Sequence, residues 1–483
     1  MMSNKLLPAI ALTFITLATF VIFFADGYLQ WVNSDTAGEA YGLSQDIRFP
    51  QGLFAEEGHR SRITGHLLSY IPFNLAGTIY RELFNDPVNS LYFAQGIMTG
   101  TIYVLLIMIS AAYISFAAGV LSWRYIFSAF ILMLFVMALP SILLLNAPFG
   151  IGVRFSHQAV MTNYVGTMTL ALFALFPYWR YLCVGKWDDL YGNHYLRVIL
   201  YFLVIAVMFS STVTSIWLTI FAGFALMVSL YHRIREIRFN VGPGYLKSLL
   251  QIDTKYRPLL LMAILGILAI GLEFFSPRGG ETAATFSLSR YLNVLIGFFT
   301  ASGSTLIFFG PLALGVVACR FYVKSQFSFE RSLLLNILPW LITVNLIYIV
   351  VVGMPIIPYR FGGHNLGRDT VLMATWSLSL WFVAAMLSFW RDRKLIWFAP
   401  LALFILITNA LNFFSFPYYG YRAEQKIIFE RINAWNSSQP LDTTLRLSWR
   451  GLAFSQDACI DHTIPMLKKI GIISPNREVI VVP

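Results

Sequence analysis

Charged residues are scarce in this chain. Asp, Glu, Lys and Arg make up only 12% of its 483 residues, whereas 58% are hydrophobic and the mean hydropathy is +0.68. Soluble globular proteins carry about 25% charged residues, because most of their surface faces water. The composition therefore indicates an integral membrane protein.

Cysteines and the motifs of soluble nucleotide-dependent enzymes are also rare or missing. Cys183, Cys319 and Cys459 lie far apart, so they predict neither a disulfide framework nor a metal site. The chain contains no Walker phosphate loop, dinucleotide fingerprint, HExxH motif or nucleophile elbow, so nucleotide-driven chemistry is not expected. It also has no internal repeat or low-complexity segment, which disfavours an inverted-repeat transporter.

Long apolar runs divide the chain into predicted membrane spans. A span needs roughly 20 mostly apolar residues, and about eleven such runs are present. We split the continuous run at 197–231 at its hydroxyl-rich centre, Ser210, Ser211 and Thr212. The predicted fold is therefore an all-α polytopic membrane protein. Its spans are 6–24, 91–119, 126–147, 159–178, 197–211, 214–231, 258–275, 298–319, 333–353, 370–390 and 395–414.

Lys and Arg residues orient this bundle. Loops on the side of the N-terminus hold 17 of the 34 Lys and Arg residues, and the opposite loops hold 9. Because basic loops stay in the cytoplasm, the N-terminus is predicted inside and, with eleven spans, the C-terminal tail outside. The first run is expected to remain attached as a signal anchor. Topology and anionic lipid headgroups account for most of the +11 net charge, so no nucleic-acid partner is expected.

Two outward segments are long enough to fold, one at 25–90 and the tail at 415–483, which follows a transmembrane domain at 1–414. In the first, SDTAGEAYGLSQDI predicts a short helix, and ITGHLLSYIPFNLAGTIYRELF predicts an amphipathic helix interrupted near Pro72. We expect both helices along the membrane surface. In the tail we expect a small α/β cap, with a helix at 421–436 and strands near 443–449 and 478–482.

Acidic residues gather soon after the first span, at Asp35, Glu39 and Asp46. On a helix that begins at Asp35, Glu39 lies one turn further along and on the same face. Ionisable residues close to the membrane indicate function, because their desolvation is costly. The alternative is that Asp35 only caps a helix.

Cations occur on several outward loops, where planar guanidinium groups suit phosphate oxygens. Taken singly, each Arg is explained by a headgroup contact or a loop ion pair, whereas together they predict an anion site. The predicted phosphate or substrate contacts are Arg60, Arg62, Arg154, His157, Arg278, Arg290, Arg360, His364 and Arg368.

The long outward segment after the first span, with its acid in WVNSDTAGEA, resembles the GT-C superfamily of membrane glycosyltransferases. Size, span number and modest outer tail are similar to bacterial and phage O-antigen glucosyltransferases. The resemblance implies Asp35 as catalytic base, Glu39 or Asp46 as supporting acid, and Glu281 as a second acid. It also implies a polyprenyl-phosphate donor of glucose or another hexose, a lipid-linked O-antigen or other glycan acceptor, and a periplasmic active face on the bacterial inner membrane.

The residues fit an inverting transfer. A carboxylate, Asp35, takes the proton of the acceptor hydroxyl while cations, with Arg60, Arg62, Arg154 and Arg360 as candidates, stabilise the departing lipid phosphate. His157 and His364 are assigned as orienting groups. Phosphate leaves readily, so no general acid is needed, in contrast to glycosidases. A divalent cation that bridges the acids and the phosphate is compatible with these residues, but no ligand spacing requires one.

Two other functions stay open at this point. An O-antigen polymerase or ligase also uses a polyprenyl-linked sugar and outward arginines, but its major outer loop usually lies later in the chain. A flippase or transporter of lipid-linked sugars would place ionisable residues at the midplane of several spans, and the centres of the apolar runs contain almost none.

Overall fold

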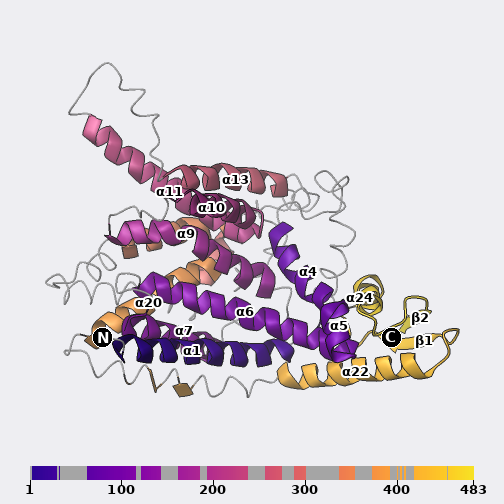
Figure 1. Cartoon of the computed structure of the whole chain (residues 1–483). Helices are drawn as coiled ribbons and strands as arrows, with labels where there is room; N and C mark the ends of the chain where they lie inside the picture. Colours follow the sequence, from indigo (N-terminus) through magenta and orange to yellow (C-terminus); the bar gives the residue numbers. More distant parts are fainter. Residues whose placement is uncertain are drawn as a thin grey trace.

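The computed structural model of the chain is mostly helical and describes residues 3–29, 32, 63–115, 121–142, 161–184, 193–237, 256–274, 288–300, 337–353, 372–391, 418–453 and 455–483, with a few helical positions between 400 and 408 (Figure 1). The helices of the bundle are α1 (Ser3–Tyr28), α4 (Ile63–Gly77), α5 (Ile79–Phe84), α6 (Pro87–Ser115), α7 (Trp123–Ile142), the π-helical turn η2 (Met161–Gly166), α9 (Thr167–Val184), α10 (His194–Met208), α11 (Thr212–Ile237), α13 (Arg257–Phe274), α15 (Leu288–Thr300), α18 (Leu338–Gly353) and α20 (Leu372–Arg391).

Apolar composition determines where these helices form. Each predicted span that lies in the described residues coincides with a helix. The eighth span, at 298–319, and the eleventh, at 395–414, lie almost entirely outside the described residues. Within the described part of the chain, three helices are long and apolar enough to cross a membrane, namely Leu6–Tyr28, Pro87–Ser115 and Thr212–His232. The membrane-type helical fold is thus confirmed in outline, while the number and orientation of the spans stay predictions.

Small residues let α1 and α6 pack closely along their length, side by side in Figure 1. A β-carbon added to Gly96 would lie 2.8 Å from the Phe24 ring, and one added to Gly100 would lie 3.0 Å from the Phe20 ring. Gly96 and Gly100 form a GxxxG pair, which allows two helix backbones to approach within a membrane. Gly96 and Gly100 therefore allow α1 and α6 to form a closely packed seam.

The hydroxyl-rich break predicted inside 197–231 is confirmed. Helix α10 ends at Met208 and α11 begins at Thr212. Hydroxyl groups bind the freed carbonyl oxygens there: Ser210 Oγ donates to Val207 O over 2.6 Å and Ser215 Oγ donates to Met208 O over 2.7 Å. Whether the two helices cross the membrane separately remains a prediction.

The predicted interruption at Pro72 is wrong. Pro72 lies inside α4, and the helix instead stops at Gly77, because Thr78 has non-helical backbone angles and separates α4 from α5. Gly65, Ser69, Phe73 and Ala76 are buried on one face of α4. Leu67 and Ile71 are exposed on the other, so α4 is apolar on both faces rather than amphipathic. Its buried face packs on α6 and η2, which explains how the helix tolerates an internal proline.

The tail forms the α/β unit that its sequence predicts. Helix α22 (Tyr418–Ser438) precedes strand β1 (Leu445–Ser448), and the chain then returns through α23 (Gln456–Ala458), the π-helical turn η8 (Cys459–Thr463) and α24 (Ile464–Lys469) to β2 (Val479–Val482). The strands pair in parallel, with Leu445 opposite Val479. A parallel pair requires a crossover connection, which the three short helical segments supply.

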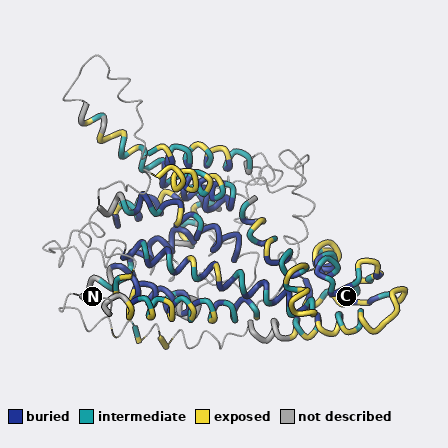
Figure 2. The backbone as a smooth tube through the Cα atoms, in the orientation of Figure 1, coloured by how far each residue is buried: buried dark blue, intermediate teal, exposed yellow. Residues whose placement is uncertain are grey.

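Among the described residues, the buried hydrophobic side chains form two cores. The larger core lies among the apolar helices, and Figure 2 shows buried backbone through the middle of the bundle with exposed positions on its outer helices. The second core joins the tail to α4 and to the start of α6. It includes Phe73, Ala76, Val88, Leu91 and Tyr92 on one side and Phe429, Ile432, Leu467 and Ile470 on the other. The tail unit therefore sits on the end of the bundle where α1 ends and α6 begins, opposite the N-terminus (Figure 1).

Candidate functional site

Most of the predicted site residues lie outside the residues that the structure describes. Of Arg290, only the backbone position is given, near the start of α15. Within the described part of the chain, no three His, Cys, Asp or Glu side chains lie together as metal ligands do. The roles of all predicted residues therefore stay predictions. Those outside the described ranges are Asp35, Glu39, Asp46, Glu281, Arg60, Arg62, Arg154, His157, Arg278, Arg360, His364 and Arg368.

The chain leaving α1 is tied to the tail by the side chain of Gln425. Gln425 Oε1 accepts from the backbone N–H of Val32 over 2.8 Å, and Gln425 Nε2 donates to the carbonyl of Val32 over 2.9 Å. The same carboxamide accepts from Tyr92 Oη and donates to Gly451 O, each over 3.4 Å. A carboxamide has two donors and two acceptor sites, so all four of these are used. Val32 and Gln425 are both buried, which makes this clasp costly to open.

A second set of polar contacts links the end of α1, the start of α6 and α22. Lys426 Nζ lies 3.8 Å from a Glu430 carboxylate oxygen and donates to Tyr28 Oη over 3.0 Å. Tyr28 Oη donates in turn to Asn89 Oδ1 over 3.1 Å, and Asn89 Nδ2 donates to Asp86. Asp86 also accepts from the N–H of Val88 over 2.8 Å, in the first turn of α6. The end of α1 and the start of α6 are thus held at fixed positions relative to α22.

A buried arginine closes the far end of α22. Arg477 is only 1% exposed, and its Nε donates to Asn436 Oδ1 over 3.0 Å. Its terminal nitrogens donate to the carbonyl oxygens of Asn436, Gln439, Pro440 and Thr443 over 2.7 to 3.1 Å. The five N–H donors of a guanidinium therefore have five acceptors, most of them at the end of a helix where carbonyl groups lack partners. This arginine has a structural role, and it fixes the length and direction of α22.

Helix α24 of the tail contacts α4 and α5. Lys469 Nζ lies 4.6 Å from the centre of the Tyr70 ring, a cation–π distance. The guanidinium of Arg81 lies against Gly471, whose φ of +83° belongs to the left-handed region that favours glycine. A side chain at position 471 would displace Arg81, so glycine is required there both for its backbone angle and for space.

Two buried polar side chains at this end of the bundle escaped the sequence prediction. Asp26 in the last turn of α1 and Gln95 in α6 are both 0% exposed. The two helices meet here, since Gly27 lies against the carbonyl oxygen of Gln95. An ionisable residue at the end of a membrane helix is itself a signal of function, and that signal was available for Asp26. Both side chains lie on the same side of the bundle as the Gln425 clasp.

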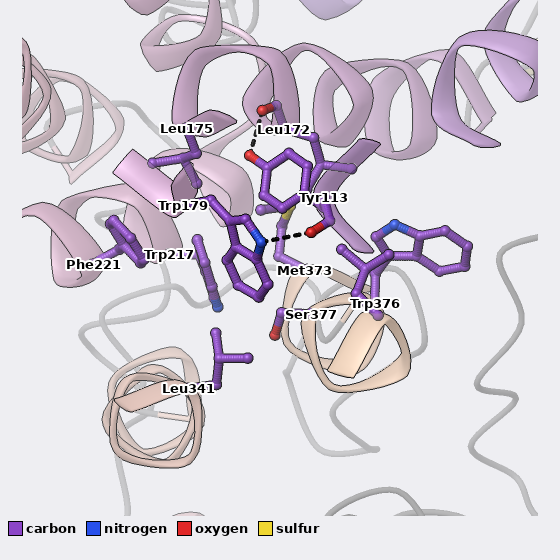
Figure 3. A pocket seen from close by; sticks show the side chains of 11 residues that line it. Tyr113, Leu172, Leu175, Trp179, Trp217, Phe221, Leu341, Met373, Trp376 and Ser377 are labelled. Carbon is purple, nitrogen blue, oxygen red and sulfur yellow. Dashed lines mark hydrogen bonds between the residues drawn. The ribbon is translucent and has the colours of Figure 1, made fainter. Parts of the chain in front are cut away.

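The cavity in Figure 3 is not a substrate site. It lies between α6, α9, α11, α18 and α20 and leaves about 20 Å³ for a water-sized sphere, which is room for roughly one water molecule. The polar atoms of its aromatic lining are bonded to protein: Trp179 Nε1 donates to Tyr113 O over 2.9 Å, and Tyr113 Oη donates to Leu172 O. Trp217 Nε1 likewise donates to Asn345 Oδ1 over 2.8 Å. It is a packing defect in the bundle core.

Comparison with known proteins gives no relative. The chain matches no protein-family model, no curated protein and no solved structure.

Proposed function

We propose that this chain is a membrane glycosyltransferase. It transfers a hexose from a polyprenyl-phosphate donor to a lipid-linked O-antigen or other glycan on the periplasmic face of the bacterial inner membrane. The observation that carries the proposal is the position of the tail. The Val32–Gln425 clasp ties Val32, which precedes Asp35 by three residues in the sequence, to a folded α/β unit at one end of an apolar helix bundle. Two lipid-anchored substrates meet at such an end.

The chemistry follows from the residue types. Asp35 takes the proton of the acceptor hydroxyl as that oxygen attacks the anomeric carbon, and the bond from this carbon to the lipid phosphate breaks. The phosphate leaves with both bonding electrons, and Arg60, Arg62, Arg154 and Arg360 stabilise its negative charge. His157 and His364 orient the phosphate. Attack from the face opposite the leaving group inverts the anomeric configuration.

A flippase receives less support from the described bundle. The amide of Asn345, buried in the middle of α18, would be a natural contact for a polar cargo. Its Nδ2 donates to Ser377 Oγ over 3.0 Å and to Ala374 O over 3.3 Å, and its Oδ1 accepts from Trp217. This amide is therefore occupied by helix packing.

A membrane assay tests the proposal. Vesicles that contain the full chain are given labelled polyprenyl-phosphate hexoses and a lipid-linked glycan, and the product is sized. Asp35→Asn should reduce transfer by about 100-fold to 10,000-fold, the usual contribution of a general base, with expression and donor binding retained. The matched control is Asp442→Asn, because Asp442 is exposed in the tail.

Each outcome is decisive. Full transfer by Asp35→Asn removes the assignment of the base, and no transfer by the unmodified chain with any donor removes the glycosyltransferase. A product extended by many repeat units would instead indicate a polymerase, and movement of the intact donor across the vesicle would indicate a flippase.

A further inference from the structure

We infer that Gln425 is a positioning residue for the reaction, because it holds the backbone at Val32, three residues before the proposed catalytic base Asp35. The inference rests on the proposed function and extends it to a residue on the other side of the sequence, 393 positions from Val32. A neutral amide in a polar tail has no sequence signature that would suggest this role.

The clasp constrains Val32 in a way that a single hydrogen bond does not. Because Gln425 binds both the N–H and the C=O of Val32, it holds both backbone polar groups of that residue, as a neighbouring strand would. Val32 is 0% exposed, so water cannot replace either bond while the tail is in place.

The proposed base, Asp35, lies close to the clasp along the chain. Asp35 follows Val32 by three residues, which span at most about 11 Å of extended chain. Holding a reacting group in place contributes strongly to rate, and a displacement of about 1 Å can reduce turnover about 100-fold. An anchor at Val32 therefore limits how far the Asp35 carboxylate can move from its substrate.

Gln425 is itself surrounded by residues that connect α22 to α1 and α6. The next residue, Lys426, donates to Tyr28 at the end of α1, and Phe429 one turn further is fully buried in the second core. Tyr92 of α6 contacts the Gln425 carboxamide directly. The tail unit thus contacts both the end of α1 and α6, and these contacts hold Gln425 next to Val32.

The test compares Gln425→Ala and Gln425→Glu with Gln439→Ala, in full-length protein in vesicles. Gln439 is a matched control because its side chain is exposed and only its backbone carbonyl is used by Arg477. Two quantities are measured: hydrogen exchange of the Val32 amide, and kcat and KM for sugar transfer.

Gln425→Ala should raise exchange at Val32 and lower kcat at least 10-fold, with KM for the donor changed less than 2-fold. Gln425→Glu retains the acceptor oxygen for the Val32 N–H and loses the amide donors. Its kcat should therefore lie between that of Gln425→Ala and that of the unmodified chain. If Gln425→Ala does not fold, the Val32 amide exchange and the kcat of Gln425→Glu test the positioning role. Gln439→Ala should match the unmodified chain in both measurements.

Full kcat in the Gln425 variants, with Val32 deprotected, overturns the positioning role and leaves the glycosyltransferase intact. Absence of transfer in the unmodified chain and in Gln439→Ala overturns the proposed function, and the positioning role falls with it.

Discussion

The guanidinium of Arg477 lies 4.6 Å from the centre of the Trp435 ring, stacked over the residue that precedes its main acceptor, Asn436. The contact combines a cation–π interaction with the five hydrogen bonds that close the end of α22. No acidic side chain is among these partners, so the buried charge is stabilised by backbone dipoles.

Replacement of Arg477 should destabilise the tail unit. Lysine retains the charge but cannot reach the separate acceptors of a planar guanidinium, so Arg477→Lys should cost roughly 3 kcal/mol in free energy of unfolding. Hydrogen exchange of the α22 backbone amides at increasing denaturant concentration measures this free energy. Arg446→Lys, at an exposed strand position, should change the free energy little. Equal free energies of unfolding for the two variants would contradict the structural role of Arg477.

The α1–α6 seam should not tolerate side chains at Gly96 or Gly100. An added methyl group there would press on the Phe24 or Phe20 ring, so Gly96→Ala and Gly100→Ala should each cost about 1–3 kcal/mol. Gly223 in α11 is the control, because a β-carbon there meets nothing within 4 Å. Gly223→Ala should be neutral or stabilising, since alanine favours a helix more than glycine does. Thermal unfolding in detergent ranks the stabilities of the three variants. A Gly96→Ala protein as stable as Gly223→Ala would contradict the close packing of α1 on α6.

The thiol of Cys459 should be unreactive in the folded tail. Burial raises the pKa of Cys459 to about 11, from an ordinary value near 9. Maleimide labelling at pH 8, in a Cys183→Ser and Cys319→Ser background, should therefore be slow until the tail unfolds.

The same shift sets a pH dependence of stability. The folded state binds the thiol proton of Cys459 more tightly than the unfolded state does. The resulting contribution to the free energy of unfolding is therefore complete below pH 9 and decreases as the pH rises from about 9 to 11. Cys459→Ser should remove that decrease. Rapid labelling of the folded protein at pH 8 would contradict both expectations.

Local sequence predicted the elements of this fold well and their contacts poorly. Apolar runs located the helices, the hydroxyl-rich centre of 197–231 located the break after Met208, and the strands predicted near 443–449 and 478–482 match β1 and β2. Pro72 misled because the packing of α4 on α6 outweighs the local cost of proline, a tertiary effect that no window of sequence contains.

The candidate site shows the same limit. Sequence identified acids and cations by residue type, and their roles remain predictions. It did not identify Gln425 or Arg477, because each works through partners that only the folded chain brings near, and Asp26 was overlooked at the edge of an apolar run. Residue type indicates possible chemistry, whereas position depends on long-range contacts.

The Val32–Gln425 clasp also sets an order of assembly. Val32 emerges early in synthesis, yet its partner is made only after every helix from α1 to α20. During all of that time the exit of α1 lacks its anchor, so a chain that stops before α22 cannot form the clasp. If the proposed function holds, sugar transfer would begin only once the bundle has been fully synthesised, which would keep half-made copies from consuming the lipid-linked donor.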